Sequence, residues 1–284
     1  MKQQIEYIIS QLRESYSYEE SRELAYWILE EIYGLTRAEI LIGCKDTKKN
    51  VNAQEKLRNV QDIETILQKL RAHVPVQYIF GHTEWKGLDL RVTSATLIPR
   101  PETAELVDWV LSTCDKRSPL RVMDIGTGSG CIAISIALEK EDSTVTAVEK
   151  YEDAYKYLLK NIKHNRVKNI KGVMADVLEE PFGSYDIIVS NPPYIKNSEK
   201  EDLSKEVLKE PHTALFGGED GLFFYREITK NWKKALKPEG ILAFEVGINE
   251  DTAVAEILKA EGFKNIGFKT DLLGIQRVVF GTAD

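Results

Sequence analysis

The sequence predicts an α/β fold built on a mostly parallel sheet, preceded by a small bundle of helices. From residue 120 onward, short β-branched runs alternate with stretches of helical period, which is typical of a parallel sheet covered on both faces. Residues 3–72 show helical period and few strand signals. A length of 284 residues exceeds the usual size of one domain and favours two.

The first 72 residues are expected to form an independent helical domain. Apolar residues recur at helical spacing in two sets, Ile5, Ile8, Ile9 and Leu12, and Leu24, Trp27, Ile28 and Ile32. Thr36 and Glu39 have the spacing of a capping box, so a third, short helix is expected to begin there. A fourth helix, carrying Leu57, Val60, Leu67 and Leu70, would complete the bundle.

Residues 73–100 are predicted to connect the two domains through a β-hairpin. After Pro75, residues 76–81 and 84–92 are rich in β-branched and aromatic residues and are broken by glycines, which favours strands. Lys86-Gly87 would form the turn of the hairpin. Residues 99–101, Pro-Arg-Pro, then interrupt the chain, and a helical pattern follows them. The second domain is therefore expected to occupy residues 101–284.

The strands of the sheet are expected at residues 121–125, 144–148, 186–190 and 241–245, with helices between them. Two further runs close the chain, at 266–269 and 276–280. Because too few residues separate these two for a helical crossover, they are expected to pair antiparallel at one edge of the sheet.

Composition excludes some classes of protein and disfavours others. No apolar run reaches the roughly 18 residues of a membrane helix, and the N-terminus lacks the apolar region of a signal peptide, so a cytoplasmic protein without a membrane partner is expected. A net charge of −7 opposes long-range attraction to nucleic acid, although a local basic patch is not ruled out by it.

No metal site or disulfide framework is predicted. The three cysteines are odd in number, far apart and without paired spacing, so they are expected to be reduced and buried; they are Cys44, Cys114 and Cys131. The four histidines also lack ligand spacing; they are His73, His82, His164 and His212.

A glycine-rich loop follows the first predicted strand, and it comprises Gly126, Thr127, Gly128, Ser129 and Gly130. Open α/β sheets bind ligands where such a strand ends and a helix begins. A dinucleotide fingerprint would need a third glycine at position 131, which is Cys131, and the Gly-Lys-Ser/Thr ending of a phosphate-binding loop is absent. The alternative is a turn required only for a tight connection.

An acidic residue, Glu149, follows the next predicted strand, 23 residues beyond Gly126. A carboxylate at about this offset accepts hydrogen bonds from both hydroxyls of a ribose.

The most informative motif is Asn191-Pro192-Pro193-Tyr194, which follows a strongly apolar strand. The two prolines lack backbone donors and restrict the chain, so the Asn191 amide and the Pro192 carbonyl become fixed acceptors beside an aromatic ring. This arrangement suits a planar NH₂ group.

In this order the three motifs resemble class I S-adenosylmethionine methyltransferases that act on amino or amide nitrogens, among them adenine-N6 DNA methyltransferases and protein glutamine methyltransferases. Further segments resemble the release factor glutamine methyltransferase family: residues 96–103, Glu210-Pro211 with 214–221, residues 244–247, and Asp271-x-x-Gly274-x-x-Arg277. The resemblance covers essentially the whole chain. Where that family often has a large aromatic residue and a glutamine, this sequence has Val177 and Glu250.

The resemblance implies a Rossmann-like domain with a seven-stranded sheet, and S-adenosylmethionine as cofactor, released as S-adenosylhomocysteine. It implies that residues 126–130 hold the methionine and ribose parts, Glu149 the ribose, Asp176 and Val177 the adenine, with Asn191 also beside the cofactor. Asn191, Pro192 and Tyr194 would be catalytic, and Pro193 and Arg100 would join them in binding substrate. The implied substrate is the Gly-Gly-Gln loop of class-1 peptide chain release factors, methylated on the N5 amide.

Three other functions compete with this one. An adenine-N6 nucleic-acid methyltransferase would use the same motif on a flipped base, but it would need a basic cleft and a target-recognition insertion, and the sequence offers neither. A ribosomal-protein glutamine methyltransferase would differ mainly in its N-terminal domain. A non-catalytic binding module would be expected to have lost Asn191 or Tyr194.

Overall fold

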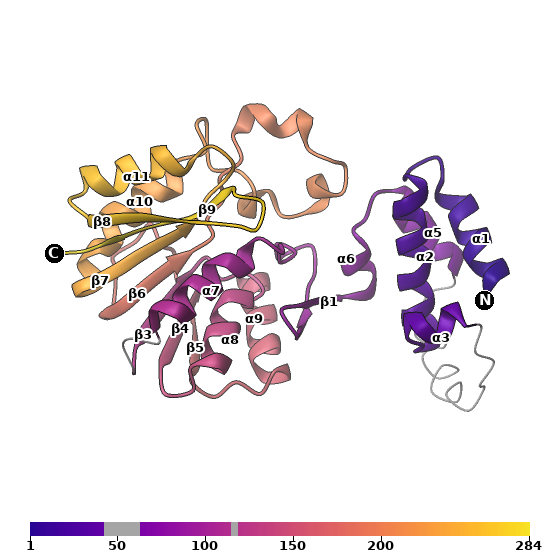
Figure 1. Ribbon diagram of the computed structural model, residues 1–284, viewed down its shortest axis with the longest axis horizontal. Helices are drawn as coiled ribbons and strands as arrows, with labels where there is room; N and C mark the ends of the chain where they lie inside the picture. The colour runs from indigo at the N-terminus through magenta and orange to yellow at the C-terminus, as the bar shows by residue number, and fades with distance from the viewer. Residues whose placement is uncertain (43–62, 115–118) are drawn as a thin grey trace. The chain divides into compact units, whose positions relative to one another are not determined.

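The computed structural model describes residues 1–42, 63–114 and 119–284, which form two compact units. One unit consists of Met1–Gly81 together with Lys205–Lys209, and the other of His82–Ser204 and Glu210–Asp284. Figure 1 traces the chain from the indigo N-terminal helices to the yellow C-terminal strands.

The N-terminal unit is helical, as predicted. Its helices are α1 (Lys2–Leu12), α2 (Tyr18–Tyr33), α3 (Arg37–Leu41), α5 (Ile63–Arg71) and α6 (Val76–Phe80). The apolar faces of α1, α2 and α5 enclose one core, to which Ile8, Ile28 and Leu67 contribute fully buried side chains. Of the residues expected in the fourth helix, Leu67 and Leu70 lie in α5, whereas Leu57 and Val60 lie outside the described residues.

The predicted capping box is confirmed at the start of α3. The Thr36 hydroxyl accepts a hydrogen bond from Glu39 N at 3.3 Å, and Thr36 N donates to the Glu39 carboxylate at 2.8 Å. Two backbone donors at the helix end, which have no partner inside the helix, are thereby satisfied.

Residues 76–80 form the helix α6 and not the predicted strand. Pro75 precedes the helix, where its missing N–H costs nothing, and Gly81 ends it in the left-handed region at φ 77°, donating to Gln77 O at 2.7 Å. In a segment of five residues these two end signals outweigh the β-branched and aromatic composition.

A short segment from late in the sequence belongs to the N-terminal unit, and nothing in the sequence predicted this. Glu206 accepts a hydrogen bond from His73 at 2.6 Å and lies beside the hydroxyl of Tyr16, which also donates to Leu70 O at 2.8 Å. The pair between residues 73 and 206 spans 133 positions of the chain.

The second unit is built on a seven-stranded sheet in the order β5-β4-β3-β6-β7-β9-β8. Its strands are β3 (Arg121–Ile125), β4 (Thr144–Glu149), β5 (Ile170–Met174), β6 (Tyr185–Ser190), β7 (Leu236–Glu245), β8 (Lys264–Thr270) and β9 (Gln276–Thr282). All pairs are parallel except those that β9 makes with β7 and β8. The predicted fold class and the antiparallel edge are confirmed, while β5 was not predicted.

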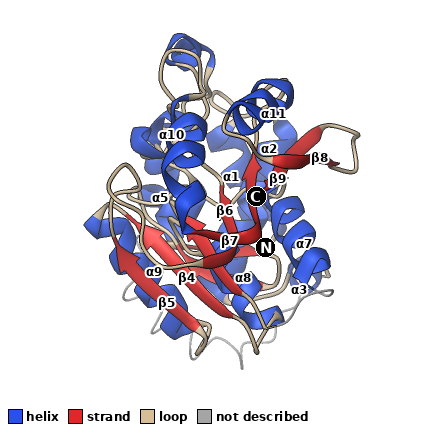
Figure 2. Cartoon of the chain, turned by 90° about the vertical axis from the view of Figure 1, so that its left-hand side faces the viewer, coloured by secondary structure: helices blue, strands red, loops and turns tan. Residues whose placement is uncertain are grey.

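Helices cover both faces of this sheet (Figure 1). On one face, α7 (Thr103–Cys114), α8 (Cys131–Glu139) and α9 (Glu152–His164) share a core with alternate residues of the strands, such as Val122 and Ile187. On the other, α10 (Phe223–Trp232) and α11 (Asp251–Ala260) pack on the intervening residues, such as Met123 and Ile188. Figure 2 shows β5 and β8 at the two edges of the sheet.

Short helices complete the second unit along the chain between β6 and β7. They are η2 (Asn197–Asp202), η4 (His212–Ala214) and η5 (Lys233–Ala235), and η3 (Val207–Lys209) lies in the segment that packs with the N-terminal unit. None of the helices in the described ranges has the length and apolar character that crossing a bilayer requires.

The predicted hairpin is present as β1 (His82–Trp85) and β2 (Leu88–Arg91). Lys86 and Gly87 both have positive φ, 50° and 75°, which matches the twist of a two-residue hairpin turn.

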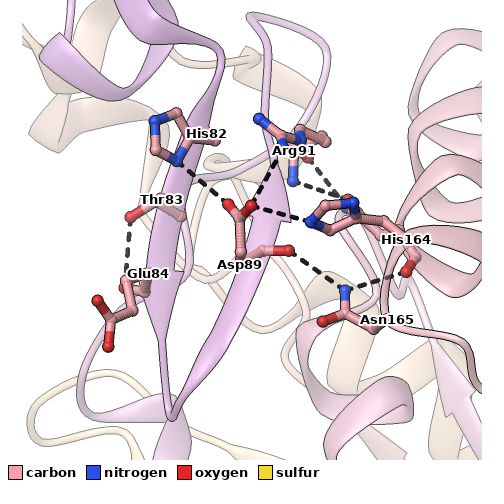
Figure 3. A network of polar contacts seen from close by, with 8 residues as sticks. His82, Thr83, Glu84, Asp89, Arg91, His164 and Asn165 are labelled. Atoms are coloured by element: carbon pink, nitrogen blue, oxygen red, sulfur yellow. Dashed lines mark hydrogen bonds and ion pairs between the residues drawn. The ribbon is translucent and has the colours of Figure 1, made fainter. Parts of the chain in front are cut away.

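Polar contacts fasten this hairpin to α9 (Figure 3). The Asp89 carboxylate contacts His82 Nδ1 at 3.1 Å, His164 Nε2 at 2.9 Å and Arg91 Nη2 at 3.1 Å. Asn165 Nδ2 donates to Asp89 O at 3.2 Å. The histidine contacts and the Arg91 ion pair lower the pKa of Asp89 against the opposing effect of partial burial. The hairpin is thus part of the second unit.

A fully buried amide links the hairpin to the glycine loop. Asn161 Oδ1 accepts from Arg91 N at 2.7 Å, while its Nδ2 donates to Arg91 O at 2.9 Å and to Ser129 O at 2.8 Å. One side chain therefore satisfies three backbone groups on two segments.

We expect Asn161→Ala to lower the free energy of unfolding by about 2–4 kcal/mol, because it strands three backbone polar groups away from water. Asn165→Ala changes the half-buried residue directly after the same helix, removes two hydrogen bonds and should cost about 1 kcal/mol or less. Urea unfolding of both variants measures the difference, and equal losses would contradict the assigned role of Asn161.

Candidate active site

Several of the predicted site residues follow strands of one sheet and meet at its carboxyl edge. A pocket opens there, at the point between the neighbouring strands β3 and β6 where the strand order of the sheet reverses. It is lined by Ala95, Thr96, Leu97, Ile125, Gly126, Gly128, Val148, Glu149, Lys150, Tyr151, Ala154, Asp176, Val177, Leu178, Ser190, Asn191, Pro192, Pro193, Thr213, Ala214, Phe224 and Ile228.

Two glycines of the loop after β3 face this pocket. Gly126 and Gly128 have φ values of 70° and 56°, and a Cβ atom on either would meet no protein atom within 4 Å. Gly126 N and Thr127 N both donate to Val148 O at 3.0 Å, which fixes the loop against β4. The glycines therefore leave backbone exposed to whatever occupies the pocket.

The remaining loop residues, Thr127, Ser129 and Gly130, do not line the pocket. Thr127 and Ser129 are buried, and a Cβ on Gly130 would lie 2.7 Å from Leu158 Cδ1. The geometry gives these three residues a role in shaping the loop.

A buried carboxyl holds the loop in place from beneath. Asp124 Oδ2 accepts from Thr127 Oγ1 at 2.6 Å and from Ala133 N, in the first turn of α8, at 3.2 Å. Complete burial raises the pKa of Asp124 to about 7. The acid thereby joins the end of β3 to the start of the following helix.

Glu149, the last residue of β4, is buried and points into the same loop. Its Oε2 accepts from Gly128 N at 3.0 Å and its Oε1 from Tyr151 N at 2.8 Å. Burial raises the pKa of Glu149, against the lowering effect of those two hydrogen bonds. Each oxygen has a further lone pair that can accept from a ligand.

Asp176 and Val177 lie on the pocket wall beyond β5. Asp176 pairs with Lys150 Nζ at 2.7 Å and accepts from Leu178 N at 3.0 Å. Val177 O accepts from Trp232 Nε1 at 2.8 Å, so α10 holds this segment.

Asn191 is held in one orientation at the end of β6. Its Nδ2 donates to Thr103 Oγ1 at 3.2 Å, which leaves Oδ1 as the acceptor. Pro192 and Pro193 follow it along the pocket wall.

Tyr194 does not line this pocket but packs against the core that α10 and α11 form with the sheet. Burial, followed by the negative charge of Glu245, raises the pKa of its phenol to about 12. The adjoining glycines allow this packing, because a Cβ on Gly217 would clash with Pro193 O and one on Gly221 with Tyr194 O. A side chain at Gly247 would meet the tyrosine ring.

Arg100 is also outside the pocket lining. Its guanidinium forms a close ion pair with the buried carboxylate of Glu210, whose other oxygen accepts from Ile98 N at 3.0 Å. The backbone carbonyl of Arg100 accepts a hydrogen bond from Trp85 Nε1 at 2.8 Å. Its part in substrate binding stays a prediction.

Sequence reasoning did not identify two buried neighbours of Asn191, Thr103 and Glu245. Both belong to segments on which the family resemblance rested, so their position could have been suspected but their contacts could not. Glu245 is only 3% exposed, and its Oε2 has no hydrogen-bond partner among the described residues.

Burial raises the pKa of Glu245 to about 7. The positive charge of Arg277 and hydrogen bonding from Thr103 act against this shift, and Glu102 adds to it. The other titratable groups around the carboxyl are two phenols and a thiol, on Tyr194, Tyr225 and Cys131. Burial keeps these neutral by raising the pKa of each.

Glu250 lies beside Tyr194 and does not line the pocket wall that carries Val177. Its Oε2 accepts from Gly247 N at 3.2 Å, and burial raises its pKa to about 7. The substitution for glutamine thus concerns the tyrosine side of the site.

Among residues 1–42, 63–114 and 119–284, no three His, Cys, Asp or Glu side chains are arranged to hold a metal ion. Cys131 is a buried free thiol, as predicted. Cys44 lies outside the described residues, and so does the side chain of Cys114.

Comparisons with known proteins match both units. Residues 107–224 match the family described as Methyltransferase small domain, and residues 3–81 match the family described as PrmC N-terminal domain. A release factor glutamine methyltransferase of Flavobacterium psychrophilum is 39% identical over 263 residues, which cover 89% of each chain. One of Bacteroides thetaiotaomicron is 34% identical over 284 residues, covering 96% of each.

A solved structure shares the fold. The hMettl16 catalytic domain in complex with a 3′UTR hairpin superposes with a TM-score of 0.56 at 19% identity, covering 70% of this chain and 76% of that one. At this identity the likeness concerns the fold alone.

The pocket fits S-adenosylmethionine, the methyl donor of this class of fold. Gly126 and Gly128 leave a cradle that side chains would fill, and Glu149 offers carboxylate oxygens beside it. An apolar wall for the adenine ring of the cofactor is supplied by Val177, Phe224 and Ile228.

We expect Gly128→Ala to weaken S-adenosylmethionine binding about tenfold or more, because the methyl group would enter the cradle. Gly87→Ala is the matched control, since Gly87 also has positive φ and open space but lies in the hairpin turn. Both variants should lose about 1–2 kcal/mol of stability. Calorimetric titration with S-adenosylmethionine compares the affinities of the two variants. Equal affinities would contradict the assignment of Gly128 to the cofactor site.

We expect Glu245→Gln to change how stability depends on pH. The wild-type carboxyl keeps its proton to about pH 7 in the folded protein but loses it near pH 4.5 in the unfolded chain. Its contribution to the free energy of unfolding is therefore fully present below pH 4.5 and is lost as the pH rises to 7. The amide has no such loss, so the melting temperature of the variant relative to wild type should rise from pH 5 to pH 8. Parallel melting profiles would contradict the raised pKa.

Proposed function

This chain belongs to the release factor glutamine methyltransferase family, and from that premise we propose that it methylates the N5 amide of the glutamine in the Gly-Gly-Gln motif of class-1 peptide chain release factors. The methyl donor is S-adenosylmethionine and the coproduct S-adenosylhomocysteine. Because release factors work with the ribosome, the proposed reaction takes place in the cytoplasm.

One observation carries the proposal: the Asn191 amide is fixed at the pocket with its nitrogen bound to Thr103. Its Oδ1 and the Pro192 carbonyl are then two acceptors with little freedom to move. A primary amide presents two N–H donors in one plane, which is the group that such a pair of acceptors recognises.

The chemical difficulty is that an amide nitrogen is a poor nucleophile. Its lone pair is delocalised into the carbonyl group, so the nitrogen must be oriented and its pyramidal form favoured. Hydrogen bonds to Asn191 Oδ1 and Pro192 O become stronger as the nitrogen gains positive charge, and they therefore stabilise the transition state more than the bound substrate.

When bound, S-adenosylmethionine supplies a methyl group on a positively charged sulfur. Transfer of this group would break its bond to sulfur as its bond to the amide nitrogen forms, and the nitrogen would afterwards release its proton to solvent. Tyr194 is not suited to act as a base, since its phenol keeps its proton to about pH 12. We assign it to packing against the amide plane and excluding water.

The domain boundaries remain part of the proposal. Residues 1–72 would form the domain that recognises the protein substrate, and residues 101–284 the domain that carries out the reaction. Residues 73–100 would connect these two domains. The match of residues 3–81 to the PrmC N-terminal domain supports the assignment of a separate N-terminal module. It also favours a release factor over a ribosomal protein as the substrate.

An adenine-N6 nucleic-acid methyltransferase is the second candidate, because the same acceptor pair fits an exocyclic amine. The net charge of −7 argues against it, since a polyanion would be repelled at long range. We therefore propose a protein substrate and no nucleic-acid partner.

We expect methyl-labelled S-adenosylmethionine to label one glutamine of a class-1 release factor and to leave an adenine-containing DNA duplex unlabelled. Asn191→Ala should reduce kcat by about 10²–10³, because one of the two acceptors is lost. Peptide mass mapping identifies the modified residue. Label on the duplex alone would replace the proposed substrate and leave the cofactor assignment intact.

A further inference from the structure

Glu245 is buried and forms no ion pair with another described residue. It is the last residue of β7, and one of its carboxylate oxygens has no hydrogen-bond partner in the part of the chain that the structure describes. The strand on its other side, β9, brings Arg277 to act on it electrostatically, but Arg277 itself forms its ion pair with Asp271 at 2.9 Å. A buried acid without a full set of partners destabilises a fold, so its presence calls for another explanation.

The side chains around this carboxyl lead to Asn191. Thr103, the first residue of α7, is only 2% exposed, and its hydroxyl oxygen accepts from Asn191 Nδ2 at 3.2 Å. A hydroxyl has one proton to give, and hydrogen bonding from Thr103 lowers the pKa of the Glu245 carboxyl, against the larger effect of burial. Hydrogen bonding from Asn191 acts on the pKa of the same carboxyl in the same direction, with a smaller effect.

This set of contacts distinguishes the two ends of the asparagine amide. Above about pH 7 the Glu245 carboxyl is ionised and only accepts hydrogen bonds. In that state it attracts the NH₂ end of the amide, directly or through Thr103, and turns the carbonyl end away from itself. Without it, the Thr103 hydroxyl could equally donate to Asn191 Oδ1 and hold the amide the other way round. The reversed amide would present two hydrogens to a substrate NH₂ group and repel it.

We propose that Glu245 is a positioning residue which, through Thr103, holds Asn191 in the orientation that presents Oδ1 to the target amide. The inference rests on the proposed function for the identity of that amide. It adds a residue from β7 and one from α7 to a site whose reactive groups come from the end of β6.

Glu245→Gln is the direct test, because glutamine keeps the shape but adds an NH₂ donor that competes with Asn191 for Thr103. We expect kcat to fall about 10- to 100-fold, with the KM values of S-adenosylmethionine and the release factor within about twofold of wild type. Thr103→Val should give a similar loss and Thr103→Ser should restore turnover. In an Asn191→Ala background, Glu245→Gln should cause no further loss.

Asp186→Asn is the matched control. Asp186 lies at the opposite end of β6, where it accepts from Arg121 N and Lys237 Nζ. The same change from carboxylate to amide should there lower stability and leave kcat unchanged.

A measurement without substrate separates this inference from the proposed function. In protein labelled with ¹⁵N at asparagine, the side-chain NH₂ signal of Asn191 is assigned by its absence from Asn191→Ala. It should shift in both Glu245→Gln and Thr103→Val, but not in Asp186→Asn. An unmoved signal, or full turnover by a folded Glu245→Gln, would overturn the inference, whereas failure of the wild type to label a release factor would overturn only the proposed function.

Discussion

The site depends on the parallel pairing of β3 with β6. Ile125 lies opposite Ser190 in this pair, so the residues that follow, Gly126 and Asn191, leave the sheet side by side. Ser190 Oγ also donates to Ile125 O at 2.8 Å, next to the last paired position. A slip of one residue would move Asn191 by roughly 3.3 Å and turn it to the other face of the sheet. The glycine loop at residues 126–130 and the two acceptors at Asn191 and Pro192 would then no longer face the same pocket.

Buried carboxyls recur at this edge of the sheet and hold the backbone around the pocket. Asp124 supports the glycine loop from β3, Glu149 supports it from β4, and Glu245 lies behind Asn191 on β7. Burial raises the pKa of all three, so each is a cost to stability near neutral pH. That cost is understandable at a functional site, where acceptors must be fixed before substrate arrives.

Local signals made much of the fold predictable. The apolar strands, the capping box at Thr36 and the hairpin turn at Lys86-Gly87 each depend on a few neighbouring residues, and each is present. The strand β5 was missed because Lys171 and Gly172 interrupt a short edge strand. The helix α6 was predicted as a strand from its composition alone, although Pro75 and Gly81 mark the two ends of a helix. Local patterns are weakest where elements are short.

The site was predictable to a similar depth. Residues directly after strands could be named, because parallel strands place their carboxyl ends along one edge. The bond between Asn191 and Thr103 joins positions 88 apart, and Glu245 lies a further 54 positions along the chain from Asn191. Only tertiary packing brings such residues together, so no spacing rule reveals them.

The acceptors themselves do not determine the substrate. Asn191 Oδ1 and Pro192 O recognise a planar NH₂ group, a feature shared by a glutamine side chain and an adenine base. The buried residues behind them set the orientation of that recognition without contacting the rest of any substrate. Selection of a protein over a nucleic acid must therefore come from surfaces outside the pocket, where an excess of 45 acidic over 38 basic residues already disfavours a polyanion. Reaction and selection are thus separate properties of this chain, the first determined at the strand ends and the second elsewhere.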